Sequence, residues 1–488
     1  MVFSSYLFLF GFLPAVLIVY YAAPRRARHV ILTVFSYIFY GWANPLFLVL
    51  LFATTAIDYV AGRVMAPHGL VAPGARPRRA RLALWAAICS NLSLLGFFKY
   101  YNFGADNIDA LARWLGLPTL GLDSVLRVTL PLGISFYTFQ SMSYSIDVYR
   151  GHTAAIRSFI DFACYVSMFP QLVAGPIIRF SEVADQLRSR THTTTKFARG
   201  VAFFCVGLAK KILLANPCGK IADLAFGAGS LGSLDAWYGA TAYAFQIYFD
   251  FSGYSDMAIG LGLMFGFTFA KNFDSPYRSQ SITEFWRRWH ISLSTWLRDY
   301  LFLPLSYSLS RRLDGIRWLG LRDEVWIYSV ATAVTMLLGG LWHGAAWKFV
   351  VWGGLHGALL VSERLRGRKG FYGSLPSPIR VGVTFTLLLV TWVFFRAPDL
   401  PQALRYLGDM LALRDPQEGA GLLAGIMYQP YYLGTVLIAG TVVWTAPQTW
   451  DWTRTLTLPK AAAVATLLVM AIVVLSTQAY NPFIYFIF

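Results

Sequence analysis

Apolar residues dominate long stretches of this chain, and most of these stretches have the length of a membrane crossing. A helix needs roughly 20 apolar residues to cross a bilayer. Seven segments have this character: residues 3–22, 82–100, 325–341, 345–361, 379–396, 429–446 and 461–479. Residues 30–61 predict two shorter spans, broken at a Trp42-Ala43-Asn44-Pro45 turn.

Four further apolar segments are interrupted by glycine, proline and polar residues. They comprise residues 125–149, 159–178, 200–216 and 236–269. Broken helices survive at membrane depth only where they are buried in protein or face a water-filled cavity. The pattern predicts an all-α polytopic membrane protein of about ten to twelve transmembrane helices, with re-entrant and amphipathic helices as well. We expect one integral-membrane domain over residues 1–488.

Composition agrees with a membrane protein and gives an orientation. Charged residues make up 13% of the chain and hydrophobic residues 57%, which excludes a disordered chain, a fibrous repeat and a disulfide scaffold. The formal net charge is +17, but basic residues collect in the cytoplasmic loops of membrane proteins, so no nucleic-acid partner is implied. Basic residues at Arg25, Arg26 and 363–369 place the N-terminus outside. The four cysteines form no C-x-x-C pair, and we expect no metal site.

His343 lies at the turn between two predicted spans that both end in basic, cytoplasmic loops. It therefore marks the deep end of a hairpin. Its neighbours Gly339, Gly340 and Gly344 leave room for a ligand or for close backbone approach, and Trp342 and Trp347 would wall a narrow tunnel. A neutral imidazole in a dry site is a good general base. The alternative is a histidine that is merely hydrogen-bonded at a helix turn.

His290 lies in the segment 284–300, which has the pattern of one amphipathic helix. Turned at about 100° per residue, the segment gathers its tryptophans and leucines on one stripe, with His290 at the edge beside Ser294, Arg287 and Arg298. An interfacial helix anchored by tryptophan and arginine explains this pattern. A functional interpretation adds that His290 faces inward while the arginines meet an anionic ligand.

Other polar residues in apolar surroundings favour structural interpretations. His356 falls 13 residues after His343, too far for direct cooperation, and we assign it to packing. Asp250 and Asp256 are unusual in a membrane segment and are candidates for lining a tunnel, but a structural ion pair is the stronger interpretation for both. Residues 169–176 carry a proline at each end and predict a re-entrant turn.

Several catalytic motifs are missing from the sequence. It contains no Walker A motif, no G-x-S-x-G elbow and no H-E-x-x-H zinc motif. The soluble acyltransferase pattern, a histidine followed four residues later by aspartate, also fails, because Thr295 and Lys348 hold the required places.

Several motifs together resemble the membrane-bound O-acyltransferase family, and most closely its alginate O-acetyltransferase type. They are the opening MVFSS, PLGISF at 131–136, FPQLVAGP at 169–176, YFDFSGYSD at 248–256, FWRRWH at 285–290 and WHG at 342–344. The D-alanyl transferases of teichoic acid are more distant relatives. The resemblance implies a central tunnel between a cytoplasmic mouth and an outward-facing funnel.

The resemblance also implies a mechanism. His343 matches the family's essential histidine, and His290 matches its second polar position. The donor is an acyl thioester, acetyl-CoA or an acyl-carrier thioester, used as a substrate with no bound cofactor. His343 acts as general base toward an acceptor hydroxyl, and His290 orients the donor or stabilises the oxyanion. We assign donor binding to four candidates: Arg287, Arg288, Arg298 and Ser294.

The implied setting is the bacterial inner membrane. Proteins of this type hand acetyl groups to periplasmic acetyltransferase or export partners that modify an exopolysaccharide such as alginate. Two alternatives remain open: transfer of D-alanine or another acyl group to a cell-wall polymer, and a transporter that performs no chemistry.

Overall fold

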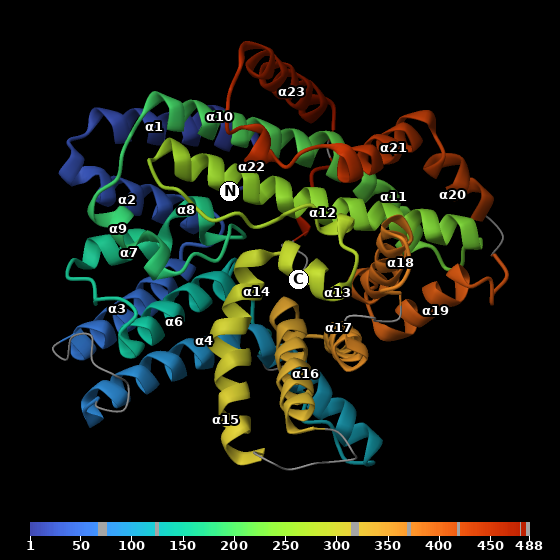
Figure 1. Ribbon diagram of the computed structural model, residues 1–488, viewed down its shortest axis with the longest axis horizontal. Coiled ribbons are helices and arrows are strands. Elements are labelled where there is room, and N and C mark those ends of the chain that lie inside the picture. The colour runs from blue at the N-terminus through green and yellow to red at the C-terminus, as the bar shows by residue number, and fades with distance from the viewer. Residues whose placement is uncertain are drawn as a thin grey trace. The chain divides into compact units, whose positions relative to one another are not determined.

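The structure, a computed structural model, describes residues 1–66, 76–122, 126–313, 322–367, 372–416, 420–478 and 480–484. Every regular element in these ranges is a helix (Figure 1). Residues 125 and 479, at the ends of two predicted spans, and part of the basic 363–369 segment lie outside them. The described chain forms two compact units, residues 1–201 with 257–270 and residues 202–256 with 271–488. That these serve one functional domain stays a prediction.

The first unit is built from helices of the N-terminal part of the chain. They are η1 (Leu7–Phe12), α1 (Leu13–Ala22), η2 (Arg25–Ala27), α2 (Arg28–Gly41), α3 (Phe47–Met65), α4 (Arg78–Trp114), α6 (Ile134–Arg150), α7 (Phe159–Ser167), α8 (Phe169–Leu172) and α9 (Phe180–Arg188). The long helices α3, α4 and α6 pack side by side in the blue-to-teal part of Figure 1. The predicted break at 42–45 is confirmed, since α2 ends at Gly41 and α3 begins at Phe47.

The second unit contains the remaining helices. They are η5 (Lys210–Ala215), α11 (Asn216–Gly227), η6 (Pro276–Arg278), α13 (Ile282–Arg288), α14 (Ile291–Leu297), η7 (Arg298–Phe302), α15 (Leu303–Leu313), α16 (Asp323–His343), α17 (Trp347–Arg366), α18 (Ser377–Arg396), α19 (Leu400–Met410), α20 (Ala420–Met427), α21 (Pro430–Thr445), α22 (Thr449–Trp452) and α23 (Leu458–Thr477). Helices α10 (Thr194–Ala209) and α12 (Ser233–Met264) each contribute residues to both units.

Five described helices are long and apolar enough to cross a membrane: α3, α4, α16, α18 and α23. A sixth is counted if α20 and α21, which meet at a 61° bend, form one span. The predicted total of ten to twelve crossings and the central tunnel stay predictions. The span predicted over 82–100 belongs to a longer helix, because α4 continues to Trp114.

Two segments predicted as interrupted are continuous helices, and the prediction was wrong for both. Helix α12 runs unbroken for 32 residues through the Gly253 region. A Cβ at Gly253 would press on the Gly207 carbonyl oxygen of α10, so this glycine serves close helix contact rather than a break. Residues 200–216 pass through the π-helical turn η5 into α11, and Pro217 falls in its first turn, where a missing N–H costs little.

The π-helical turn η5 places two lysines against two carboxylates of α12. Lys210 Nζ lies 2.6 Å from Asp256 Oδ2, and Lys211 Nζ lies 2.7 Å from Asp250 Oδ1. Both pairs are largely buried, so each charge depends on its partner. The ion pairs expected for Asp250 and Asp256 are present, but the helix that carries both carboxylates is continuous rather than broken.

A chain of hydrogen bonds ties α1, α2, α7 and the α9–α10 connection together in the first unit. Arg190 donates to His29 Nε2 at 2.6 Å and to the Tyr20 hydroxyl at 2.8 Å. Because arginine only donates, Nε2 of His29 accepts and Nδ1 carries the proton toward Asp161, 2.5 Å away. The Tyr20 hydroxyl lies 2.8 Å from His192 Nε2. Burial and the charges of Arg28 and Arg190 lower the pKa of His192 to about 4.

We expect this network to weaken in acid. The folded pKa of His192 lies below its ordinary value of about 6.5, so its stabilising contribution is complete above that pH. The contribution is lost as the pH falls from about 6.5 toward 4. The hydrogen-exchange protection of residues 188–197, corrected for the intrinsic exchange rate at each pH, should therefore fall over this range in the wild type, and less so in His192→Gln. The control is His152→Gln, whose side chain is 62% exposed. Equal acid sensitivity of wild type and His192→Gln would contradict the assignment.

Candidate active site

Helices α16 and α17 form a hairpin whose turn carries His343. His343 is the last residue of α16, and α17 begins at Trp347. The two helices cross closely because Gly340 and Gly353 face each other: a Cβ at Gly340 would overlap the Phe349 carbonyl oxygen, and one at Gly353 would overlap that of Met336. Of the three glycines expected to allow close backbone approach, Gly340 does so, whereas Gly339 faces Leu297 and Gly344 faces the Phe349 ring.

The side chain of His343 is buried among aromatic rings. Its ring centroid lies 5.0 Å from that of Trp342, 5.1 Å from that of Trp352 and 5.2 Å from that of Phe395, all in edge contacts. His343 retains 7% of its surface exposed. These three aromatic side chains form an apolar wall around the imidazole.

His290 lies at a break between two helices. The single amphipathic helix predicted over 284–300 is wrong: α13 ends at Arg288, and α14 starts at Ile291. His290 adopts the left-handed conformation with φ +42°, which is unfavourable for a residue with a Cβ. Strained backbone of this kind collects at functional sites. The break also buries His290 completely, whereas a continuous helix would have left it at the edge of the stripe.

Asn272 fixes the orientation of His290. Its side-chain Oδ1 accepts the backbone N–H of Ser292 at 3.1 Å, so this atom is an acceptor. His290 Nδ1 lies 3.3 Å from the same oxygen and therefore donates to it. The proton of the neutral ring is then on Nδ1, and Nε2 carries the lone pair. Sequence reasoning missed Asn272, whose only signal is that it is a polar residue close to the end of an apolar segment.

The imidazoles of His290 and His343 both contact the indole of Trp342. The Trp342 ring lies 6.0 Å from that of His290 and 5.0 Å from that of His343. Burial, and then the neighbouring imidazole of His343, lower the pKa of His290 well below its ordinary value. The structure thus brings together the two histidines and one of the two tryptophans that the sequence singled out.

His356 contacts the same aromatic cluster from the other side. The Trp286 Nε1–H donates to His356 Nδ1 at 3.3 Å, and the rings of Trp352 and His356 lie 4.8 Å apart. Trp352 therefore contacts both His356 and His343. His356 is fully buried and packs against aromatic rings rather than against the glycines named from the sequence. Trp352 was missed because its contact with His343 arises only when α17 folds back on α16, and Phe395 because it comes from the later helix α18.

The four candidates for donor binding have different surroundings. Arg287 is exposed and lines a cavity of about 620 Å³ together with Arg364 and Arg380, two residues that the sequence did not single out. Arg288 instead bonds Glu284 and the Asp274 carbonyl oxygen.

The other two candidates make local contacts. Arg298 pairs with its neighbour Asp299 at 2.6 Å, and Ser294 Oγ donates to the Trp289 carbonyl oxygen at 3.2 Å. Among the four, only Arg287 lines this cavity.

The remaining candidates for lining a tunnel do not share the surroundings of His343. Trp347 is 55% exposed at the start of α17. Asp250 pairs with Lys211 and accepts the backbone N–H of Ile484, and Asp256 pairs with Lys210 and accepts from Thr449. Phe251, which follows Asp250, reaches the His290 ring at 4.6 Å, so α12 supports the site through this ring. In the described part of the chain, no group of three or more His, Cys, Asp or Glu is placed to hold a metal.

The close crossing of α16 and α17 predicts that Gly340→Ala is harmful. The added methyl group would force Phe349 backbone and the His343 turn to move, which we expect to destabilise the fold by about 1–3 kcal/mol. Thermal unfolding in detergent measures the effect. The matched control is Gly354→Ala, where the new Cβ meets only Leu337 Cδ2 at an ordinary 3.6 Å. Equal unfolding temperatures for the two variants would show that the crossing does not depend on Gly340.

Comparisons with known proteins identify the family. A sequence model of the membrane-bound O-acyltransferase family (MBOAT) matches residues 152–368, which include His290, His343 and His356. The chain is 43% identical over 510 residues to the probable alginate O-acetylase AlgI of Pseudomonas putida, covering 100% of both chains. It is 34% identical to the peptidoglycan O-acetyltransferase of Helicobacter pylori, covering 85% of this chain and 80% of that protein.

A more distant similarity has a narrower extent. The teichoic acid D-alanyltransferase of Streptococcus thermophilus is 30% identical over 255 residues, 50% of this chain and 59% of that protein. The resemblance inferred from the motifs is therefore confirmed, including the greater distance of the D-alanyl transferases. The chain belongs to the membrane-bound O-acyltransferase family and is a multi-pass membrane O-acyltransferase.

Proposed function

We propose that this chain transfers an acetyl group from a cytoplasmic thioester donor for the O-acetylation of an exopolysaccharide such as alginate. The observation that carries the proposal is the pair of buried imidazoles, His290 and His343, which both contact the ring of Trp342. The choice of acetyl over D-alanyl follows from the relatives. Those named as alginate O-acetylases match over 83–100% of the chain, and those named as D-alanyltransferases match over 47–50% of it.

The cavity beside α13 is the best place for the phosphates of the donor. It is lined by Arg287, Arg364 and Arg380, while its carboxylates are occupied: Glu284 binds Arg288, and Glu363 accepts from Ile282, Thr283 and Tyr372. Arginine is well suited to phosphate because its planar fork of donors matches the phosphate oxygens.

This cavity and His343 are linked through aromatic rings. Helix α13 contributes Arg287 to the cavity and, one residue earlier, Trp286 to the aromatic cluster. The Trp286 and Trp352 rings are 5.8 Å apart, and Trp352 touches His343. A donor whose phosphates bind Arg287 must extend a narrow group past these rings to reach His343. A thioester at the end of a flexible chain meets that requirement.

His343 acts as the general base in this mechanism. A ring nitrogen of His343 takes the proton of the acceptor hydroxyl, and the hydroxyl oxygen bonds to the thioester carbonyl carbon. The carbon–sulfur bond then breaks, and the imidazolium returns the proton to the leaving thiolate. The aromatic walls exclude water, which protects the thioester from hydrolysis.

His290 orients a substrate rather than stabilising the oxyanion. An oxyanion needs a hydrogen-bond donor, but the Nδ1 proton of His290 is directed at Asn272. Its Nε2 lone pair suits an N–H or O–H of the substrate. Burial disfavours the doubly protonated ring that would donate from both nitrogens.

The setting that we propose is the bacterial inner membrane, with the N-terminus outside. Basic loops on the cytoplasmic side would face the donor, acetyl-CoA or an acyl-carrier thioester. Periplasmic acetyltransferase or polysaccharide-export proteins would receive the acetyl group on the other side. A transporter without chemistry is less favoured, because transport needs no proton acceptor buried among aromatic rings.

Replacement of His343 tests the chemistry. In a strain that lacks this chain, complementation with His343→Ala should restore essentially no acetylation, since loss of a general base costs about 10²- to 10⁴-fold in rate. The O-acetyl content of the secreted polysaccharide is measured. His152→Ala, on an exposed loop, serves as control, and membrane levels and detergent elution must match. Wild-type acetylation by His343→Ala would refute the general base.

The variant Arg287→Gln tests the donor cavity separately. Loss of one charge-assisted hydrogen bond should raise the half-saturating acetyl-CoA concentration roughly tenfold and change the maximal rate little. The purified chain and radiolabelled acetyl-CoA provide the assay. Arg298→Gln removes an exposed arginine that pairs with Asp299 and is the matched control. If the two variants saturate alike, the donor phosphates bind elsewhere.

A further inference from the structure

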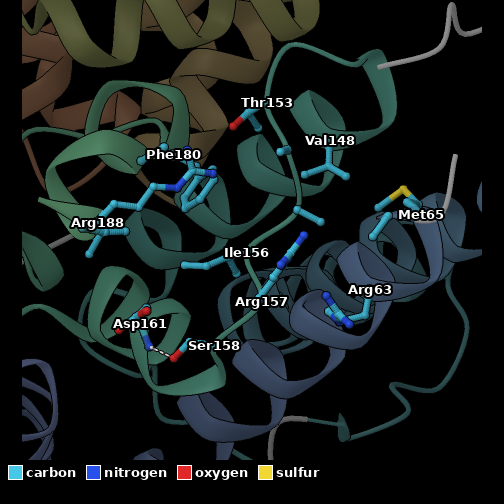
Figure 2. A pocket seen from close by; sticks show the side chains of 15 residues that line it. Arg63, Met65, Val148, Thr153, Ile156, Arg157, Ser158, Asp161, Phe180 and Arg188 are labelled. Carbon is cyan, nitrogen blue, oxygen red and sulfur yellow. Dashed lines mark hydrogen bonds between the residues drawn. The ribbon is translucent and has the colours of Figure 1, made fainter. Parts of the chain in front are cut away.

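The first unit contains a cavity of about 860 Å³ that the acyl-transfer mechanism does not use. It lies between the ends of α3 and α6, the loop that leads into α7, and helix α9 (Figure 2). Its lining combines apolar side chains with three arginines, Arg63, Arg157 and Arg188. In Figure 2, Arg63 and Arg157 lie close together, with Arg188 and Phe180 across the cavity from them.

The charge of this cavity is strongly positive. Within the described ranges, the guanidinium groups of Arg63 and Arg157 have no carboxylate partner, and Arg188 meets only the exposed Asp185 at 3.7 Å. The single lining carboxylate, Asp161, is 2.5 Å from the His29 ring, which donates to it. The cavity therefore holds an excess of donors suited to an anion.

The loop that carries Arg157 is held in place by its backbone. The Tyr59 hydroxyl donates to the Arg157 carbonyl oxygen at 2.6 Å, and the Ile156 N–H donates to the Tyr144 hydroxyl at 3.3 Å. Tyr144 in turn fits against Gly62, where any Cβ would collide with its ring. The cavity is thus formed before a ligand arrives, and ordering the loop adds little to the cost of binding.

The depth of the cavity points to the lipid headgroups. Arg63 lies in the last turn of α3, one of the five helices apolar and long enough to span a membrane. The end of such a helix lies at the boundary between hydrocarbon and water, whichever side it faces. Apolar lining residues suit the glycerol and the first methylenes of a lipid: Met65, Val148, Ile156, Phe180 and Leu187.

We propose that this cavity binds a phosphate group at the level of the lipid headgroups, held by Arg63 and Arg157 with Arg188 across from them. Guanidinium groups bind phosphate oxygens in bidentate fashion, and basic pockets between membrane helices favour anionic headgroups. An anionic phospholipid is one source of such a phosphate, and a soluble phosphate ester is the other.

Binding to the purified full chain tests the proposal. Native mass spectrometry compares phosphatidylglycerol with phosphatidylcholine of the same acyl chains, and a separate arm adds inorganic phosphate alone. We expect the Arg63→Gln/Arg157→Gln variant to bind phosphatidylglycerol about tenfold more weakly than wild type. The control variant, Arg26→Gln/Arg81→Gln, removes the same charge from two exposed positions beside predicted spans.

The lipid and inorganic phosphate arms of this experiment distinguish an anionic phospholipid from a soluble phosphate ester. Preference for phosphatidylglycerol that is lost only in the cavity variant supports a lipid ligand. Binding of inorganic phosphate that is lost in the same variant, without lipid preference, supports a soluble phosphate. Equal losses in the cavity and control variants, or no loss in either, would overturn the proposal.

A measurement on the wild type covers the case in which the cavity variant does not fold. Phosphatidylglycerol or inorganic phosphate should slow hydrogen exchange in residues 153–158, because the ligand contacts that loop. Unchanged exchange in this loop, with both ligands at saturating concentration, would equally overturn the proposal.

Discussion

The close contact between α16 and α17 is the constraint on which the candidate site depends. Two helices approach this closely only when their facing positions lack side chains, and here Gly340 and Gly353 provide that. The contact fixes the turn after α16, and the turn fixes His343. Phe349, whose ring closes against Gly344 and Phe395, then completes one wall. A histidine on a looser hairpin would not be held against Trp352 and Phe395 at the same time.

Buried polar groups in this protein are supported by specific partners, and the partners differ between structural and catalytic sites. Asp250 and Asp256 are each matched by a lysine of η5, which neutralises them. His290 donates a hydrogen bond from its Nδ1 to Asn272, and aromatic rings contact the imidazole. The lysine–aspartate pairs brace helix α12. The hydrogen bond at Nδ1 of His290 instead fixes the orientation of the imidazole, and therefore the direction in which Nε2 points. This contrast separates the carboxylates of α12 from the histidines.

Sequence reasoning was most reliable where one local pattern decides the structure. The α16–α17 hairpin follows from two apolar runs joined by a glycine-rich turn, and the break at 42–45 follows from Asn44 and Pro45. Sequence reasoning failed where residues distant in the sequence determine the local conformation. The periodicity of 284–300 fits a single helix, and nothing local indicates that Asn272 stabilises a left-handed His290 between two helices. Likewise Gly253 reads as a helix breaker until α10 is seen against it.

The same reasoning explains why arginines were harder to place than histidines. A histidine in an apolar segment is costly, so its position alone suggests a role. The arginines around α13 are near solvent, where ion pairs cost little and form readily. Arg288 and Arg298 each meet an acidic neighbour in the chain, Glu284 and Asp299, and those carboxylates satisfy them locally. Arg287 has the same sequence surroundings, but it shares a cavity with Arg364 and Arg380, which come from α17 and α18. An anionic donor is best bound where arginines from several helices line one cavity, rather than where arginines follow one another along a single helix.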